Sequence, residues 1–250
     1  MSATDPRRVA VVIPALNEER AIRGVVESVL AICPNVIVVD DGSTDATIER
    51  IADLPVTLIR HETSLGKGQG LRDGFRKARA LGFDAVVTMD GDGQHLAADV
   101  PRMLAAAARY PGHLVIGARI RNRENQPKAR RRANNFADWG ISWGCGIPVA
   151  DTQSGQRYYP AAALELADIA ADDFVFEAAV LIAAAREKGV GVVSVPIESR
   201  YQGEFRTSHF RPIRDVSRIT WYTVKRIAAY GNIIASYRRS HGTPPLIYDP

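Results

Sequence analysis

The N-terminal half of the chain alternates short runs rich in β-branched residues with longer segments of helical composition. The strand-like runs are Val9–Ile13, Val36–Val39, Val56–Ile59, Ala85–Met89 and Leu114–Ile116. The helical segments between them are Glu18–Ala31, Thr44–Ala52, Lys67–Ala80 and Ala97–Arg109. Continuous apolar runs are typical of buried parallel strands, and a strand–helix–strand succession covers both faces of a sheet with helices. The pattern predicts an α/β fold, with a mostly parallel, twisted sheet inside a three-layer sandwich.

After Gly117 the regular alternation of strand-like and helical segments ends. We expect a helix over roughly Lys128–Trp143, a turn-rich segment at Asp151–Pro160, a second helical segment ending near Lys188 and a strand at Val190–Val195. Residues 215–239 place apolar side chains among basic ones, which predicts one long amphipathic helix or two. No repeat or linker interrupts the chain. We therefore expect a main domain over 1–210, with a helical extension over 211–250 that packs on it or faces a membrane.

The charge of the chain is mildly basic, at a formal +4 over 250 residues. Basic side chains cluster in 119–132 and again in 206–226, which favours a polyanion, a phosphate or an acidic membrane surface as partner. Cys33 and Cys145 lack any metal-binding spacing, so we expect reduced thiols, as in a cytoplasmic protein. Neither a secretory leader nor a bilayer-spanning run is recognisable, so we expect a soluble chain or one peripheral to the inner face of the membrane.

Polar side chains follow the first two predicted strands, at the edge where sheets of this kind bind ligands. Pro14, Asn17 and Glu18 follow the first strand, and Asn17 suits either capping the next helix or holding a nucleotide. Asp40 and Asp41 follow the second strand. Because adjacent carboxylates repel each other unless shared donors hold them, this pair favours contact with ribose hydroxyls or a base edge.

The two following strand ends carry a lysine and a pair of carboxylates. Lys67 lies between glycines at the start of a helical segment, which suits either an anion site or a flexible turn with an exposed lysine. Asp90 and Asp92 flank a single glycine, with Gln94 nearby, and this is the strongest signal in the chain. Such carboxylates favour one hard cation, Mg²⁺ or Mn²⁺, that also bridges diphosphate oxygens. A tight turn is the alternative interpretation.

Two further polar positions lie beyond the fourth strand. Arg119 directly follows the fifth strand, where a guanidinium can clamp a phosphate with two hydrogen bonds. The segment from Asp151 to Arg157 is polar where a crossover through the core would be apolar. A plain turn, with Asp151 and Arg157 as a surface pair, also accounts for that segment.

Taken in order, these segments resemble family 2 glycosyltransferases with the Rossmann-like GT-A fold. The segments that carry the resemblance are VIPALNEE, VDDGSTDAT, GKGQGLRDGF, MDGDGQH, GAR, DTQSGQR, FVFEAAVL and VPIESRY, which span most of the chain. The branch they resemble most is that of the dolichol- and polyprenyl-phosphate mannosyltransferases. The resemblance implies an inverting transfer of a sugar from a GDP- or UDP-linked donor to an acceptor, with a polyprenyl phosphate as the expected acceptor.

The resemblance also implies roles for individual residues. The residues on the nucleotide side would be Pro14, Asn17, Glu18, Asp40, Asp41, Lys67 and Asp90. The metal would be held by Asp90, Asp92 and Gln94, and the acceptor phosphate by Arg119, Arg131 and Asn135. The catalytic residues would be Asp92, Arg119, Asp151 and Glu177. A lipid phosphate is already an anionic nucleophile, whereas a sugar hydroxyl would need a carboxylate base, for which Asp151 and Glu177 are the candidates.

Two departures from the family pattern keep alternatives open. Ala179 stands where the family often has a second acid, and Asn135 stands where a serine is common. Transfer to a soluble sugar or polysaccharide is therefore one alternative, and a non-catalytic nucleotide-binding partner of a membrane assembly is another. A nucleotidyltransferase fits the order of the motifs less well. We expect no nucleic-acid partner, and the sequence makes no prediction of the oligomeric state.

Overall fold

A computed structural model describes residues 5–121, 128–198 and 212–249. Its strands form a single seven-stranded sheet in the order β3-β2-β1-β4-β6-β5-β7. The strands are β1 (Val9–Ala15), β2 (Val36–Asp40), β3 (Thr57–Arg60), β4 (Ala85–Thr88), β5 (Leu114–Ala118), β6 (Arg157–Pro160) and β7 (Val192–Pro196). All neighbouring pairs are parallel except the two that involve β6. The mostly parallel sheet predicted from the apolar runs is therefore confirmed.

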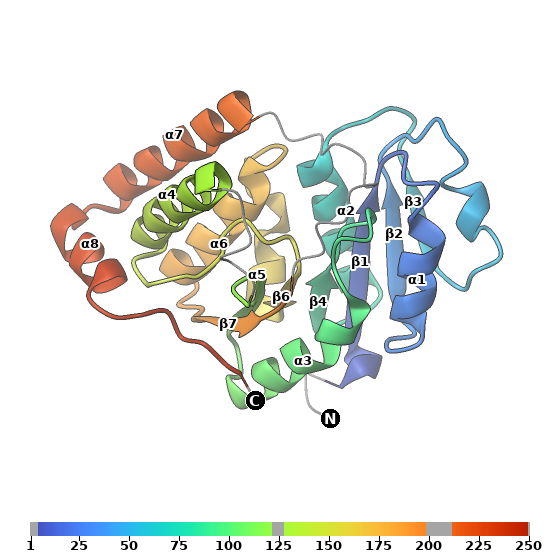
Figure 1. The fold of residues 1–250 in the computed structure, drawn as a ribbon, viewed down its shortest axis with the longest axis horizontal. Helices are drawn as coiled ribbons and strands as arrows, with labels where there is room; N and C mark the ends of the chain where they lie inside the picture. Colours follow the sequence, from blue (N-terminus) through green and yellow to red (C-terminus); the bar gives the residue numbers. More distant parts are fainter. Residues whose placement is uncertain (1–4, 122–127, 199–211, 250) are drawn as a thin grey trace.

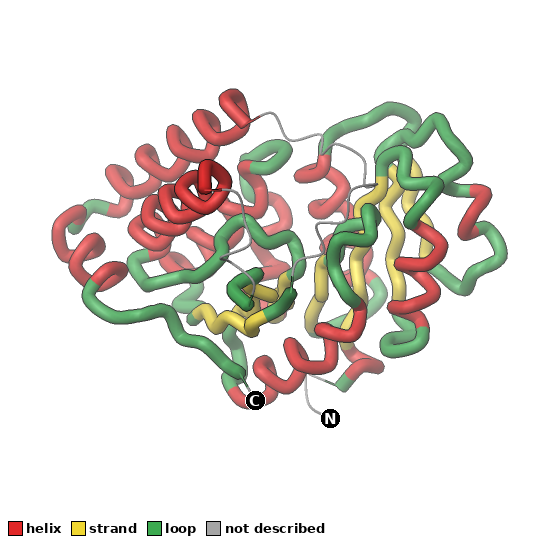
Figure 2. The backbone as a smooth tube through the Cα atoms, viewed as in Figure 1, coloured by secondary structure: helices red, strands yellow, loops and turns green. Residues whose placement is uncertain are grey.

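Helices cover both faces of this sheet (Figure 1). The α-helices are α1 (Ile22–Leu30), α2 (Lys67–Ala80), α3 (Val100–Arg109), α4 (Lys128–Cys145), α5 (Ala161–Leu164), α6 (Val175–Glu187), α7 (Pro212–Tyr230) and α8 (Ile233–His241), and the 3-10 segments are η1 (Pro6–Arg8), η2 (Glu49–Ile51), η3 (Ala97–Asp99) and η5 (Glu165–Asp168). One core packs α2 and α6 on the sheet, and a second core packs α1 and α3 on the opposite face. Figure 2 shows α4, α7 and α8 grouped at the end of the molecule away from β2 and β3.

Two segments differ from their predicted structure. The tetrapeptide from Arg157 to Pro160 was expected to belong to a turn, but it forms the antiparallel strand β6 between β4 and β5. The segment Thr44–Ala52 was expected to be helical, but it is mostly turn and ends in the short η2. There the Asp45 carboxylate accepts hydrogen bonds from the backbone and hydroxyl of Thr47, which compete with helical hydrogen bonding.

The C-terminal segment forms two helices, one of the two alternatives that its pattern allowed. α7 ends where Gly231 and Asn232 both adopt positive φ angles, of 66° and 51°. α7 packs on α4 and α6, and α8 also packs on α4. Beyond α8, the tail pairs with the edge strand β7 through Ser194 and Ile247. No helix in the described ranges is both long and apolar enough to cross a membrane.

The packing of α2 on the sheet depends on an aromatic group. Phe75 is fully buried, with its ring centroid 4.8 Å from that of Tyr159 on β6 and 5.9 Å from that of Phe176 on α6. These contacts join α2, β6 and α6, which carry Lys67, Arg157 and Glu177, respectively. The position of those residues therefore depends on the packing around Phe75.

The Phe75→Ala substitution is expected to lower the free energy of unfolding by about 3–5 kcal/mol, because it leaves a large cavity among rings that cannot collapse into it. Urea denaturation followed by circular dichroism measures this change. Leu81, 49% exposed at the end of α2, is the matched control. Leu81→Ala should change stability by no more than about 0.5 kcal/mol. Equal losses in the two variants would show that the aromatic group is not a packing centre.

Candidate active site

The loops after β1 and β2 are joined by side-chain to backbone hydrogen bonds. Asn17, which has a positive φ of 56°, donates its backbone N–H to Ser43 Oγ at 2.8 Å. Its Oδ1 accepts the Thr44 N–H at 2.8 Å. The Glu18 N–H donates to Thr47 Oγ1 at 2.7 Å. Asn17 therefore does not cap α1 but fixes one loop to the other. Pro14, within β1, pairs with Val39 of β2 below this junction.

Asp41 is held by four donors from its own chain. They are the ring of His61, the hydroxyl of Ser64 and the backbone N–H groups of Leu65 and Gly66, all 2.7–2.9 Å from a carboxylate oxygen. Burial alone would raise the pKa of Asp41, but these donors outweigh it and lower the pKa below its usual 3.8. Asp41 thus shapes the loop that leads into α2.

Asp40 lies beneath this loop and is fully buried. Its Oδ1 accepts the Ser43 N–H at 3.1 Å, and its Oδ2 lies 3.5 Å from Nε of Arg60. Among the described residues, Oδ2 of Asp40 has no hydrogen-bond partner. The two adjacent carboxylates are thus held unequally: Asp41 accepts four hydrogen bonds, whereas Asp40 accepts one and has Arg60 as its nearby positive charge.

Lys67 begins α2 and is the central cation of the site. Its ammonium lies 2.7 Å from Oδ1 of Asp90 and 3.3 Å from Oε2 of Glu177 on α6. Burial by itself would lower the pKa of Lys67, but the charges of Asp90 and Glu177 raise it above its usual value. Of the two interpretations of this glycine-flanked lysine, the exposed lysine in a flexible turn is wrong, because the side chain is held between two carboxylates.

Close approach of the backbone makes the Lys67–Asp90 contact possible. A Cβ atom added to Gly155, just before β6, would lie 2.7 Å from Asp90 Oδ2 and 3.1 Å from Lys67 Nζ. Gly66, at φ +91°, lies against the side chain of Asp173, and Gly68 lies against the backbone of the same residue. A side chain at Gly155 would push against Asp90 and Lys67, and one at Gly66 or Gly68 would push the start of α2 away from Asp173.

The two aspartates after β4 differ in charge environment. Burial would raise the pKa of Asp90, but Lys67 and His95 outweigh it and lower that pKa to about 2. Burial and the charge of Asp90 together raise the pKa of Asp92. Gln94 donates its backbone and side-chain N–H groups to the Asp92 carboxylate, each at 2.9 Å. The loop therefore presents one permanent negative charge and a second carboxylate that a nearby cation would help to ionise.

Arg119, directly after β5, is positioned by Asp151. Its backbone N–H and Nε donate to Asp151 Oδ2 at 2.7 and 2.8 Å, and Nη2 donates to Oδ1 at 2.8 Å. Asp138 on α4 accepts the Thr152 N–H at 2.7 Å and so fixes the Asp151 turn, in which Asp151 has a positive φ of 50°. The charge of Arg119 is close enough to Asp90 to contribute to its low pKa.

Arg157 is buried, so the interpretation of Asp151 and Arg157 as a surface pair in a plain turn is wrong. Its side chain is 2% exposed and donates to the carbonyl groups of Thr152, Ser154 and Glu177 at 2.7–3.1 Å. It ties the loop before β6 to the start of α6. The sequence also does not predict a role for Asp138 or His95, because neither belongs to a recognisable motif of ligand or catalytic residues. Only the fold brings Asp138 to Thr152 and His95 within 3.7 Å of Asp90.

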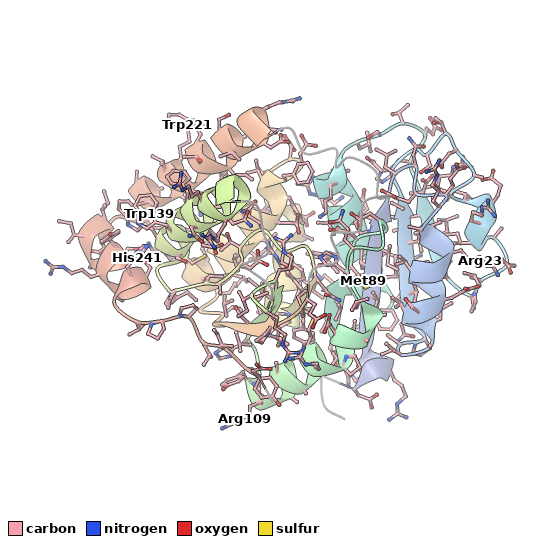
Figure 3. All side chains as sticks on the ribbon, in the orientation of Figure 1. Arg23, Met89, Arg109, Trp139, Trp221 and His241 are labelled. Carbon is pink, nitrogen blue, oxygen red and sulfur yellow. The ribbon has the colours of Figure 1, made fainter. Side chains whose placement is uncertain are left out.

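The fold therefore brings most predicted residues to one edge of the sheet. One charge cluster forms there, made of Asp90, Asp92, Lys67, Glu177 and Arg119. It lies near Met89, and Figure 3 labels Met89 in the middle of the molecule. The Asp40–Asp41 loop joins this cluster through Gly66. Arg131 and Asn135 lie on α4, with Asn135 exposed. No three His, Cys, Asp or Glu side chains in the described ranges converge as a metal site.

Comparison with known proteins identifies the family. The profile described as "Glycosyl transferase family 2" matches residues 10–162, more than half of the chain. The chain belongs to this family. It is a glycosyltransferase, as the ordered motifs predicted.

Three curated relatives cover most of the chain. The UDP-N-acetylglucosamine–dolichyl-phosphate N-acetylglucosaminyltransferase of Methanococcus voltae is 30% identical over 76% of this chain and 84% of its own length. The polyprenol monophosphomannose synthase of Mycolicibacterium smegmatis is 32% identical over 76% of this chain and 77% of its own length. The undecaprenyl-phosphate mannosyltransferase of Micrococcus luteus is 31% identical over 80% of this chain and 88% of its own length.

Solved structures confirm the GT-A fold. The glucosyl-3-phosphoglycerate synthase of Mycobacterium tuberculosis, crystallised with Mn²⁺, uridine diphosphate and phosphoglyceric acid, matches with a TM-score of 0.65 at 22% identity. The match covers 91% of this chain and 80% of that one. At this identity the likeness concerns the fold.

The Asp41→Asn substitution is expected to lower the free energy of unfolding near pH 7 by about 1.5–3 kcal/mol, because charge-assisted hydrogen bonds to the loop are lost. Because folding lowers the pKa of Asp41 below 3.8, its contribution is complete above that value and disappears as the pH falls through the folded pKa. The difference between wild type and variant should therefore shrink in acid.

Urea unfolding of both proteins at neutral pH and at several pH values below 3.8 tests this expectation. The exposed Asp172→Asn substitution is the control, with an expected change of no more than about 0.5 kcal/mol at any of these pH values. A difference between Asp41→Asn and wild type that persists unchanged in acid would contradict the role assigned to the carboxylate charge.

Proposed function

We propose that this glycosyltransferase moves a sugar, with inversion, from a GDP- or UDP-linked donor to a polyprenyl phosphate. The observation that carries the proposal is the charge cluster at one sheet edge, where the Asp90–Asp92 loop and Lys67 lie within electrostatic reach of Arg119. Such an arrangement suits two phosphate-bearing substrates, one for the carboxylate–lysine side and one for the arginine side. The relatives that carry dolichyl, polyprenol or undecaprenyl phosphate in their names support the choice of acceptor.

The donor set on the Asp90–Asp92 loop fits Mg²⁺ or Mn²⁺. Asp90, Asp92 and the amide oxygen of Gln94 are hard oxygen ligands from one short loop, and diphosphate oxygens would complete the coordination. The pKa of Asp92 is raised because burial and the charge of Asp90 disfavour its ionised form. A divalent cation bound beside it would favour the ionised form again. When bound, the metal would neutralise the negative charge that develops on the departing nucleoside diphosphate.

Lys67 adds a second positive charge on the donor side. It begins α2, so its ammonium lies at a helix N-terminus, where backbone N–H groups and the helix dipole also favour phosphate. Glu177 holds Lys67 from the opposite side to Asp90. We therefore assign Glu177 to orienting the lysine. The loop that Asn17, Asp40 and Asp41 shape would take the nucleoside, with Pro14 and Glu18 at its base.

On the acceptor side, Arg119 is the residue we assign to the phosphate. Asp151 accepts three hydrogen bonds from Arg119, so its carboxylate is engaged in orienting the guanidinium and is a poor candidate for a general base. No base is needed if the acceptor oxygen belongs to a phosphate, which is already anionic at neutral pH. Arg131 and Asn135 on α4 would extend the acceptor site away from Arg119 along that helix.

Asp92→Asn is expected to reduce turnover at least about 100-fold, because a metal ligand and its stabilisation of the leaving diphosphate are lost. Sugar transfer to undecaprenyl phosphate in detergent, assayed with GDP- and UDP-linked sugars, measures the effect. Excess chelator should abolish wild-type activity, and added Mn²⁺ or Mg²⁺ should restore it. Full activity of the variant, or of chelated enzyme, would eliminate the metal role.

Donor choice and fold integrity are checked by calorimetry. GDP and UDP are titrated with and without Mn²⁺ into wild type and Asp92→Asn, and circular dichroism shows whether the variant retains its fold. Metal-enhanced binding of one nucleotide to the wild type alone would select the nucleobase. Failure of both nucleotides to bind would favour a protein without sugar-transfer activity.

Arg119→Gln is expected to lower kcat/KM for a polyprenyl phosphate about 10- to 100-fold, because a charge-assisted phosphate contact is worth about 1.5–3 kcal/mol. Arg119→Lys keeps the charge and should recover part of the loss. Steady-state kinetics with the lipid phosphate and with soluble sugar acceptors separate the acceptor classes. The exposed Arg109→Gln on α3 is the control. An unchanged kcat/KM for the lipid phosphate would contradict the role of Arg119 in binding that acceptor and would favour a soluble acceptor instead.

A further inference from the structure

Aromatic side chains from α4 and α8 form a continuous cluster at the surface. Trp139 on α4 lies 5.8 Å from Phe136, 5.6 Å from Trp143 and 6.5 Å from Tyr237 between ring centroids. Tyr237 on α8 stacks on His241 at 4.5 Å. We call these five residues the aromatic surface. Figure 3 labels Trp139, His241 and Trp221 at the same end of the molecule, away from Arg23 and Arg109.

The aromatic surface and the start of α8 are unusually apolar for an exposed region. Phe136 is 52% exposed and Trp139 40%, while Ile233 and Ile234 on α8 are 47% and 68% exposed. Exposed apolar patches with polar borders mark interaction sites. Trp and Tyr are also the residues that prefer a boundary between water and hydrocarbon, because each combines an apolar ring with a polar group.

The charge of this region has a single sign along α8. Residues 231–242 contain no Asp or Glu, and Arg238 and Arg239 are both exposed. On α4, Arg132 is exposed as well, and Asp138 is turned to the Thr152 backbone. Guanidinium groups around exposed aromatic and aliphatic side chains complement an anionic lipid head-group layer.

We propose that the aromatic surface, with Ile233, Ile234, Arg238 and Arg239, docks the protein on an anionic lipid bilayer. The inference rests on the proposed function, because a polyprenyl phosphate acceptor is delivered from a membrane. α4 connects the two sites: Asp138, which fixes the turn that positions Arg119, lies between Phe136 and Trp139 in sequence. A bilayer against this surface would meet the acceptor side of the site along α4.

Binding to vesicles tests docking without any substrate. Co-sedimentation is measured with vesicles of phosphatidylcholine mixed with phosphatidylglycerol and with vesicles of phosphatidylcholine alone. The protein should partition to the anionic vesicles, and less so at high salt. All three tryptophans lie on α4 and α7, so the intrinsic fluorescence reports this end of the molecule and should shift to shorter wavelength on binding.

Two exposed-surface variants and their matched controls assign the binding to this surface. The double variant Arg238→Gln/Arg239→Gln should weaken partitioning about thirtyfold, and Ile234→Ser about tenfold. Arg109→Gln and Leu81→Ser, which are also exposed but lie on α3 and at the end of α2, should bind as wild type. Turnover of the variants with polyprenyl phosphate in detergent should remain at wild-type level, whereas turnover on vesicles should fall.

Three outcomes would overturn the docking surface. They are no binding to anionic vesicles, equal weakening by the control variants, and dimerisation through this face, seen as Ile234→Ser converting a sedimenting dimer to a monomer. Detergent turnover with polyprenyl phosphate tests the proposed function separately. Its loss in the wild type together with intact vesicle binding would remove the acceptor assignment and leave the docking surface in place.

Discussion

The site is organised around the pairing of Lys67, which is partly buried, with two carboxylates. A buried ammonium is costly unless it is paired, and so are the carboxylates of Asp90 and Glu177. Each of the three charges is therefore tolerable only while the other two remain in place. Because they come from α2, the loop after β4 and α6, their mutual neutralisation fixes three separate parts of the fold around one point. Gly155 is needed for the same reason, since the backbone must pass close to Asp90 and Lys67 there.

A fully buried cation, Arg157, supports this arrangement. It donates to the carbonyl groups of Thr152 and Ser154 in the loop before β6 and to that of Glu177 on α6. Lys67 therefore pairs with the side-chain carboxylates of Asp90 and Glu177. Arg157 instead binds backbone carbonyl groups, including that of Glu177. The contrast gives a physical basis for assigning ligand binding to the first cation and structural support to the second.

The sequence predicted the parallel strands, the helix that begins at Lys67 and the charged strand ends, because all of these depend on local pattern. It did not predict β6, whose first residue, Arg157, is buried while donating hydrogen bonds to carbonyl groups, one of them on the distant Glu177. For the same reason it could not separate the two interpretations of Asn17, which bonds across to Thr44, or find Asp138. The metal role of Asp92 came from its spacing to Asp90, and the roles of Arg131 and Asn135 came from resemblance; all three stay predictions. Ala179 is fully buried in α6, so an acid there would be surrounded by apolar side chains.

The reversed direction of β6 affects the order in which the sheet can be completed. Four strands, β3, β2, β1 and β4, pair among themselves within the first 88 residues, and β5 pairs in parallel with β7. Only β6 hydrogen-bonds to both groups. During synthesis from the N-terminus, the first group can collapse early through short-range contacts, whereas joining the two groups has to await residues 157–160. The active edge, which draws on both groups, is consequently among the last regions of the molecule to form.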